Sequence, residues 1–195
     1  MNLVLRGLYV GSCRDARDER ALTEKKISHI VSVHDRARPF NDGRQQLVVN
    51  ISDQESENIL EHVSTVNDFI HRARLTGGCV LVHCMLGISR SVTFVIAYVM
   101  SVTSLGWREA LQVVRSTRHR ASPNFGFKRQ LQAFEKDFVE SERRRLMDID
   151  VAEGLILDDR NHCQRALLSY MRWVQFGDLL MDEHESLLIE KLSET

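Results

Sequence analysis

Apolar residues occur along this chain in two patterns: short runs rich in Val, Ile and Leu, and longer stretches in which they recur every three or four positions. Short runs of this composition are typical of β-strands. They predict strands at residues 8–10, 29–33, 47–51 and 79–83. The last run leads into a short segment that contains a glycine, and we expect a loop there, at residues 84–89.

The longer stretches predict helices, since their apolar residues would share one face. Helices are expected at residues 14–26, 58–75, 90–102, 107–117 and 126–145. The first of these is highly charged, which is typical of a helix on the protein surface. The second is followed by Gly77 and Gly78, which favour a helix end.

Strands and helices alternate, and this order predicts an α/β fold with a central, mostly parallel sheet flanked by helices on both faces. We assign residues 1–147 to this domain. Residues 148–195 differ, because they are acidic and carry a loose apolar stripe between residues 166 and 191, interrupted by Gly177. They predict a helical, partly amphipathic C-terminal extension that packs on the domain or on a partner.

The net charge of −1 hides an asymmetry between these two parts. Residues 1–147 carry 22 Lys and Arg against 16 Asp and Glu, whereas residues 148–195 carry 4 against 11. A basic domain suits acidic, phosphorylated partners, although ordinary solvated surfaces would look the same. We expect no nucleic-acid partner.

Four cysteines show neither metal-ligand nor disulfide-scaffold spacing. This favours a reducing compartment, the cytoplasm with the nucleus as a second location, and predicts neither metal nor cofactor. The longest apolar stretch, residues 92–99, is too short to cross a bilayer. Residues 1–11 lack the apolar region of a signal peptide, so we expect none.

Candidate chemistry is concentrated at residues 80–91, which read VLVHCMLGISRS. A cysteine six positions before an arginine is weak evidence alone, but here a strand precedes Cys84, Gly87 lies within the loop, and a helix begins at Arg90. A loop that runs into a helix N-terminus presents unpaired N–H groups and the positive end of the helix dipole, which bind phosphate. We call residues 84–90 the phosphate loop.

Each residue type in this loop fits one task in phosphate chemistry. The loop and helix dipole lower the pKa of Cys84 and make it a nucleophilic thiolate. Arg90 offers a planar fork for two phosphate oxygens, and Ser91 can donate a hydrogen bond to the sulfur. The remaining phosphate-binding residues are Met85, Leu86, Gly87, Ile88 and Ser89, which act through the backbone together with Arg90. The pattern predicts a cysteinyl-phosphate intermediate and no metal.

The leaving alcohol or phenol needs a proton from a carboxylic acid on a nearby loop. Asp53 is our choice, because it closely follows the predicted strand at residues 47–51. Glu55 and Glu57 share its loop and are the main alternatives. Asp35 and Asp42 are the next alternatives after these two glutamates.

The sequence HCMLGISRS resembles the HCxxGxxRS signature of dual-specificity phosphatases, a branch of the protein tyrosine phosphatases. The resemblance covers about residues 3–140 and includes GLYVGS, SHIVSVHDRARP, VTSLGW and SPNFGFKRQLQAFEK. It is closest to the small atypical members, the subgroup of the JNK-pathway-associated phosphatase. It implies a protein tyrosine phosphatase-like fold, a general acid at Asp53 and a role for Asn124 in bracing the phosphate loop. His83 is expected to support the loop by hydrogen bonding, not to act as a base.

The resemblance also implies the substrates, phosphotyrosine and phosphoserine or phosphothreonine in proteins, including components of MAP-kinase pathways. A phosphoinositide or RNA phosphatase is the nearest alternative, but the phosphate loop lacks the lysines that multiply charged head groups favour. An inactive phosphate-binding module would usually lack the cysteine, the arginine or the acid. Relatives that begin Met-Gly-Asn are myristoylated on the glycine; here Asn2 replaces it, so we expect no membrane anchoring.

Overall fold

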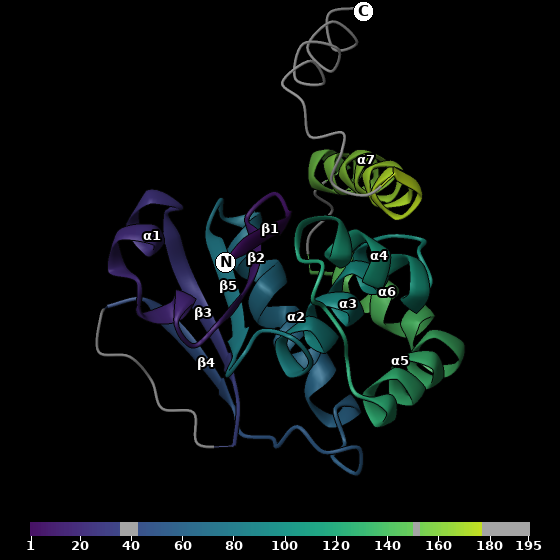
Figure 1. Ribbon diagram of the computed structural model, residues 1–195, viewed down its shortest axis with the longest axis horizontal. Helices are drawn as coiled ribbons and strands as arrows, with labels where there is room; N and C mark the ends of the chain where they lie inside the picture. The colour runs from purple at the N-terminus through teal and green to yellow at the C-terminus, as the bar shows by residue number, and fades with distance from the viewer. Residues whose placement is uncertain (36–42, 150–152, 177–195) are drawn as a thin grey trace, which may run out of the picture.

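A mixed five-stranded sheet runs through the centre of the computed structural model, which describes residues 1–35, 43–149 and 153–176 (Figure 1). Its strands are β1 (Asn2–Leu5), β2 (Leu8–Ser12), β3 (Ile27–Val33), β4 (Gln45–Val49) and β5 (Cys79–Cys84). They lie in the order β1-β2-β5-β3-β4, and only β1 pairs with its neighbour in the antiparallel sense. The predicted α/β class with a mostly parallel sheet is confirmed. Strand β1 was not predicted; it joins β2 through a tight turn in which Gly7 has φ +74°.

Helices surround the sheet. They are the 3₁₀ helix η1 (Asp15–Arg17) and the α-helices α1 (Glu19–Glu24), α2 (Leu60–Leu75), α3 (Arg90–Val102), α4 (Trp107–Thr117), α5 (Phe125–Asp137), α6 (Val139–Met147) and α7 (Glu153–Phe176). Helices α3 and α4 have the predicted bounds.

Two of the predicted helices were wrong in extent. The helix expected at residues 14–26 is divided at Asp18, whose side chain accepts a hydrogen bond from the N–H of Ala21 and so starts α1. The helix expected at residues 126–145 is divided at Phe138, where φ −128° departs from helical geometry.

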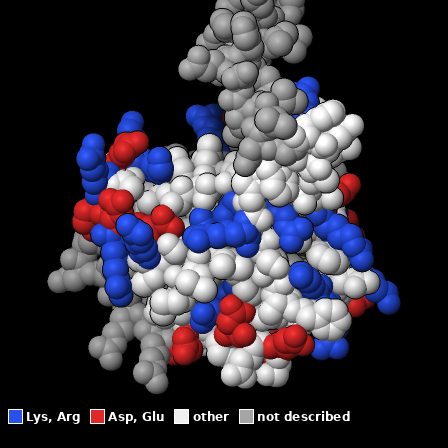
Figure 2. Space-filling model, in the orientation of Figure 1, with Lys and Arg blue, Asp and Glu red and all other residues white. Residues whose placement is uncertain are grey.

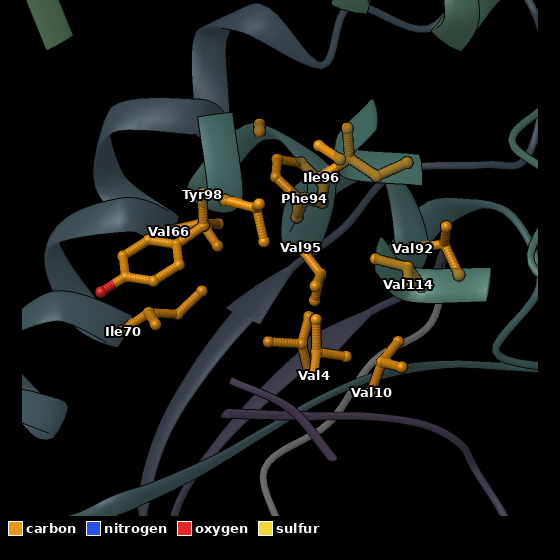
Figure 3. Close-up of a cluster of buried hydrophobic side chains, with 14 of the residues drawn as sticks. Val4, Val10, Val66, Ile70, Val92, Phe94, Val95, Ile96, Tyr98 and Val114 are labelled. Atoms are coloured by element: carbon orange, nitrogen blue, oxygen red, sulfur yellow. The ribbon is translucent and has the colours of Figure 1, made fainter. Parts of the chain in front are cut away.

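The two faces of the sheet are covered unequally. Strand β5 alternates, so that Val80 and Val82 join the large core cluster beneath the helical layer, while Leu81 joins a small cluster with Leu22 of α1. Figure 3 shows the large cluster between the sheet and α3. Every residue of α3 from Arg90 to Ser101 is buried. The phosphate loop is therefore anchored at both ends by buried elements, β5 and α3.

Helix α7 belongs to the predicted C-terminal extension and packs against α4 and β1. It begins at Glu153, before the apolar stripe predicted at residues 166–191. Gly177 and the residues after it lie outside the described part of the chain. Asp159 of α7 forms a buried ion pair with Arg74 of α2, at 2.6 Å between Oδ1 and Nη2. Arg74 also donates to the hydroxyl of Tyr98 at 3.0 Å. None of the described helices is long and apolar enough to cross a membrane.

We expect Asp159→Asn to lower the free energy of unfolding by about 3 kcal/mol or more, because it leaves the buried Arg74 charge without its counter-ion. Asp158→Asn is the matched control. Its pair with Arg6 is exposed and should contribute no more than about 1 kcal/mol. Urea unfolding of both variants measures the difference. Equal destabilisation would contradict the assigned docking of α7.

Candidate active site

The phosphate loop connects the carboxyl end of β5 to the first residue of α3. Gly87 lies at its bend with φ +66°, a region that side chains disfavour. A Cβ atom at this position would lie 2.4 Å from the backbone oxygen of Gly11 and 2.4 Å from Nη2 of Arg118. Glycine is therefore required here both for conformation and for space.

The Cys84 side chain is buried at the base of this loop, with only 2% of the residue exposed. Its Sγ accepts hydrogen bonds from the N–H of Gly87 at 3.1 Å and from the hydroxyl of Ser91 at 3.3 Å. Burial alone would raise the pKa of the thiol. The hydrogen bonds from Ser91, Gly87 and Ile88 outweigh it and hold the pKa of Cys84 below its ordinary value, which favours the thiolate.

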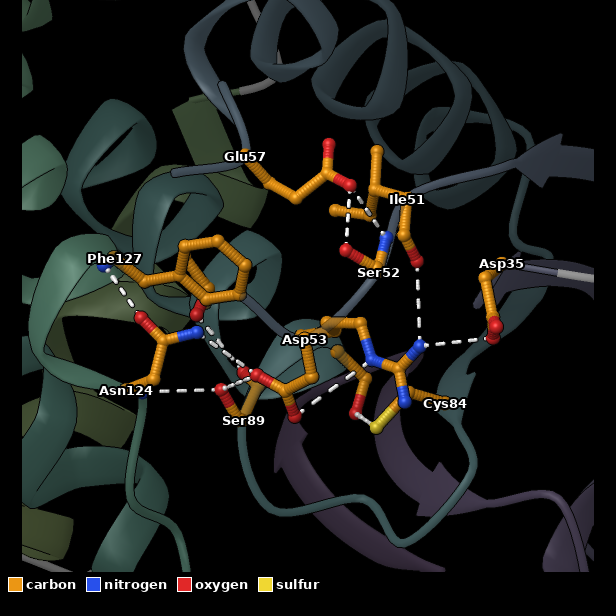
Figure 4. A network of polar contacts seen from close by, with 12 residues as sticks. Asp35, Ile51, Ser52, Asp53, Glu57, Cys84, Ser89, Asn124 and Phe127 are labelled. Carbon is orange, nitrogen blue, oxygen red and sulfur yellow. Dashed lines mark hydrogen bonds and ion pairs between the residues drawn. The ribbon is translucent and has the colours of Figure 1, made fainter. Parts of the chain in front are cut away.

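The guanidinium of Arg90 lies among Asp35, Ile51 and Asp53, which are labelled in Figure 4. Its Nη1 donates to the carbonyl oxygen of Ile51 at 3.2 Å and lies 3.5 Å from Oδ1 of Asp35. Its buried Nε lies 3.7 Å from Oδ2 of Asp53 and has no hydrogen-bond partner among the described residues. The guanidinium is thus fixed on one side and presents a donor to the site.

Asp53 lies near the start of the loop that follows β4 (Figure 4), and its carboxyl group is close to Arg90. We call residues 52–58 of this loop the acid loop. Oδ1 of Asp53 accepts hydrogen bonds from Oγ of Ser89 at 2.7 Å and from Nδ2 of Asn124 at 2.9 Å. The carboxyl group is therefore tied to both the phosphate loop and α5. Its Oδ2 faces Arg90.

The alternative acids lie in different surroundings. Glu57 turns back into the acid loop, where it accepts hydrogen bonds from the N–H of Ser52 at 3.2 Å and from its hydroxyl at 2.5 Å. Glu55 is exposed. Asp35 lies near Arg90 from the other side and is 59% exposed, and Asp42 lies outside the described residues.

The supporting residues expected from the sequence lie around the loop. His83 is buried and its Nε2 forms a hydrogen bond with Ser32 Oγ at 2.8 Å; burial lowers its pKa to about 4, so the ring is neutral. The N–H of Asn124 donates to Ser89 Oγ at 3.0 Å, and its Oδ1 caps α5 by accepting from Phe127 N–H at 2.9 Å. Asn124 thus joins three segments: α5, the acid loop and the phosphate loop.

The side chains of the phosphate loop divide between rim and interior. Met85 and Leu86 are 50% and 61% exposed, whereas Ser89 is buried. Beside Met85 an open hollow is lined also by Cys13, Arg14, Arg17 and Asp18. On the face seen in Figure 2, Lys and Arg side chains form a band across the middle. Arg14 and Arg17 thus lie beside Met85 at the apolar rim.

Three residues that hold the site were not found from the sequence. Arg118 donates to the carbonyl oxygens of the phosphate loop. Gly126 lets α5 approach the acid loop, because a Cβ atom there would lie 2.2 Å from the backbone oxygen of Glu55. Gln130 accepts from Ile59 N–H at 2.9 Å and donates to Glu57 O at 2.7 Å. Gly126 and Gln130 lie within the PNFGFKRQ stretch and Arg118 precedes it, but the sequence does not show the contacts that these residues make across the fold.

A buried cysteine whose sulfur accepts hydrogen bonds, a fixed arginine and a carboxyl group beside one loop are the groups that a cysteine-dependent phosphatase site combines. The family described as dual specificity phosphatase, catalytic domain, matches residues 8–137. The chain belongs to this family and is a protein phosphatase of the dual-specificity class. The resemblance noted in the sequence is thereby confirmed.

Individual relatives agree with this assignment. Dual specificity protein phosphatase 22 of Homo sapiens is 49% identical over 148 residues, which cover 76% of this chain and 80% of that protein. The crystal structure of DUSP15 has a TM-score of 0.73 and 42% identity, and covers 75% of this chain and 94% of its own. That of human DUSP28 has a TM-score of 0.69 and 32% identity over 72% of this chain and 99% of its own.

Proposed function

We propose that this phosphatase acts through Cys84 as nucleophile, Arg90 as phosphate clamp and Asp53 as general acid. The single observation that carries the proposal is the Cys84 sulfur, buried and surrounded by hydrogen-bond donors from Gly87 and Ser91. An inert core cysteine needs no such donors.

In the first step the Cys84 thiolate attacks phosphorus, and the ester P–O bond breaks opposite the new S–P bond. Negative charge on the equatorial oxygens is stabilised by the amides of the phosphate loop and by the Arg90 guanidinium. Asp53 gives its proton to the departing alkoxide or phenoxide oxygen. Its Oδ1 is held by Ser89 and Asn124, so Oδ2 is the oxygen that carries the proton.

In the second step water attacks the cysteinyl-phosphate and loses a proton to the Asp53 carboxylate. The S–P bond breaks and the thiolate leaves. The Ser91 hydroxyl, 3.3 Å from the sulfur, stabilises the negative charge that returns to it.

The proposed substrates are phosphorylated proteins carrying phosphotyrosine and phosphoserine or phosphothreonine, including components of MAP-kinase pathways. Two observations support protein substrates over multiply charged lipid head groups. The phosphate loop contributes no lysine, and its rim residues Met85 and Leu86 offer apolar contact to a peptide. The cytoplasm, with the nucleus as a second location, is the proposed site of action.

We expect Asp53→Asn to lower kcat about 10²- to 10³-fold on phenyl phosphate and less on 4-nitrophenyl phosphate, whose leaving group needs little protonation. The variant should also lose the basic-side fall of kcat with pH. Steady-state kinetics on both esters across pH measure this.

Glu55→Gln is the matched control, since Glu55 shares the acid loop and is exposed. It should keep both the rate and the pH profile. If Glu55→Gln showed the dependence on leaving group and Asp53→Asn did not, the acid would be misassigned.

A further inference from the structure

Arg118 follows α4 and is separated from the phosphate loop by some thirty residues of sequence, yet its side chain reaches that loop. The residue is buried, with 5% exposed. Its Nε donates to the carbonyl oxygen of Gly87 at 2.6 Å, and its Nη2 donates to that of Leu86 at 3.2 Å. One guanidinium therefore holds two consecutive carbonyl groups.

The two carbonyls belong to the peptide units whose N–H groups face Cys84. The unit between Leu86 and Gly87 carries the Gly87 N–H, which donates to the Cys84 sulfur at 3.1 Å. The next unit carries the Ile88 N–H, which also acts on the thiolate. Both peptide bonds are trans, so the C=O and N–H of each unit point in opposite directions. Holding the carbonyls outward keeps the N–H groups directed inward.

The third arm of the guanidinium is fixed from the other side, because Nη1 donates to Oδ1 of Asn2 at 2.7 Å. Asn2 in turn donates to the carbonyl oxygen of Thr117 at 2.6 Å. The neighbouring His119 stacks on Trp173 of α7, with ring centroids 4.3 Å apart. The segment that carries Arg118 is thus braced by β1 and by α7.

We propose that Arg118 is a positioning residue for the phosphatase reaction: its planar fork fixes the two peptide units that direct N–H groups at the nucleophile and at the bound phosphate. Arginine suits this task because two of its donors match two adjacent carbonyl oxygens, whereas the lysine ammonium is a single point. This inference rests on Cys84 being the nucleophile, and it adds a residue that touches neither the substrate nor the reacting atoms.

Charge alone is the competing explanation, since a buried cation near Cys84 would also favour its thiolate. The charged groups around Arg118 are Arg120, Asp15 and the Cys84 thiolate. Two variants separate the explanations. Arg118→Lys keeps the charge and loses the fork, and Arg120→Met removes a neighbouring exposed charge that makes no contact with the loop carbonyls.

The experiment measures the rate of alkylation of Cys84 by iodoacetamide against pH, together with kcat on 4-nitrophenyl phosphate. We expect Arg118→Lys to move the midpoint of the alkylation profile up by about one pH unit and to lower kcat about 10- to 100-fold. Arg118→Met should show a larger change in the same direction. Arg120→Met should leave the midpoint of the alkylation profile unchanged and kcat within about a factor of two of wild type.

Thermal unfolding is measured in parallel, and Arg118→Lys carries the test if Arg118→Met does not fold. A variant that is less stable but has the wild-type midpoint and kcat would overturn the proposal and leave Arg118 a purely structural residue. A wild-type midpoint in Arg118→Lys with a raised one in Arg120→Met would show that charge, not the fork, matters. Loss of activity in every variant with no alkylation of Cys84 even in wild type would instead contradict the assignment of the nucleophile.

Discussion

Replacing Cys84 with serine should lower the rate of aryl-phosphate hydrolysis by at least about 10⁴-fold while phosphate binding persists. The serine hydroxyl stays protonated at neutral pH, so the loop no longer contains a nucleophile. The loop amides and Arg90 do not depend on the sulfur, because the carbonyls of the loop are held by Arg118 and Arg90 is held by Ile51. Steady-state kinetics measure the first effect, and calorimetry with a phosphotyrosine peptide measures the second.

Cys79→Ser is the matched control. Cys79 begins the same strand, and it is a free, half-buried cysteine that packs against the small core cluster. Its replacement should leave kcat within about a factor of three of wild type. A Cys84→Ser enzyme that kept more than a hundredth of the wild-type rate would rule out covalent catalysis at this residue.

Replacing Arg90 with lysine should lower kcat about 10²- to 10³-fold and raise KM, although the charge is kept. The reason is geometric. Nη1 of Arg90 is engaged by the carbonyl oxygen of Ile51 at 3.2 Å, so the plane of the guanidinium is fixed and Nε is left to bind phosphate. The lysine ammonium carries its three donors on one nitrogen atom, so it cannot match the spacing of the carbonyl and two phosphate oxygens as the planar guanidinium does.

Arg120→Lys is the control for a general effect of arginine replacement, because Arg120 is exposed. It should have wild-type kinetics. A similar rate for Arg90→Lys and wild type would mean that Arg90 acts only as a point charge and that the phosphate is bound by amides alone.

Elements with a regular apolar pattern were predictable from the sequence. Helix α3 has the expected bounds because a continuous apolar segment follows the phosphate loop. Helix α4 has the expected bounds because its apolar residues share one face. The break at Phe138 was not predictable, because this residue fits the helical period on both sides. Strand β1 was not predictable because its pairing with β2 depends on the turn at Gly7.

The residues of the site also differ in whether the sequence alone could reveal them. Cys84 and Arg90 lie within one local motif, so their proximity follows from sequence spacing. Asp53 was one of several acidic residues on its loop, and only the fold shows that Ser89 and Asn124 reach it. Arg118 gave no local signal, because its partners lie far away in the sequence. Residues that act through contacts across the fold are those that sequence patterns fail to reveal.

Acid quenching of the enzyme during turnover, followed by mass spectrometry of its peptides, tests the central claim most directly. Wild type and Ser91→Ala are compared, because loss of the hydroxyl 3.3 Å from the sulfur should slow breakdown of the intermediate more than its formation. We predict one phosphoryl group on the peptide that contains Cys84, more abundant in Ser91→Ala than in wild type and absent in Cys84→Ser. A phosphoryl group on another residue, or turnover with no phosphorylated Cys84 in either active enzyme, would contradict the account.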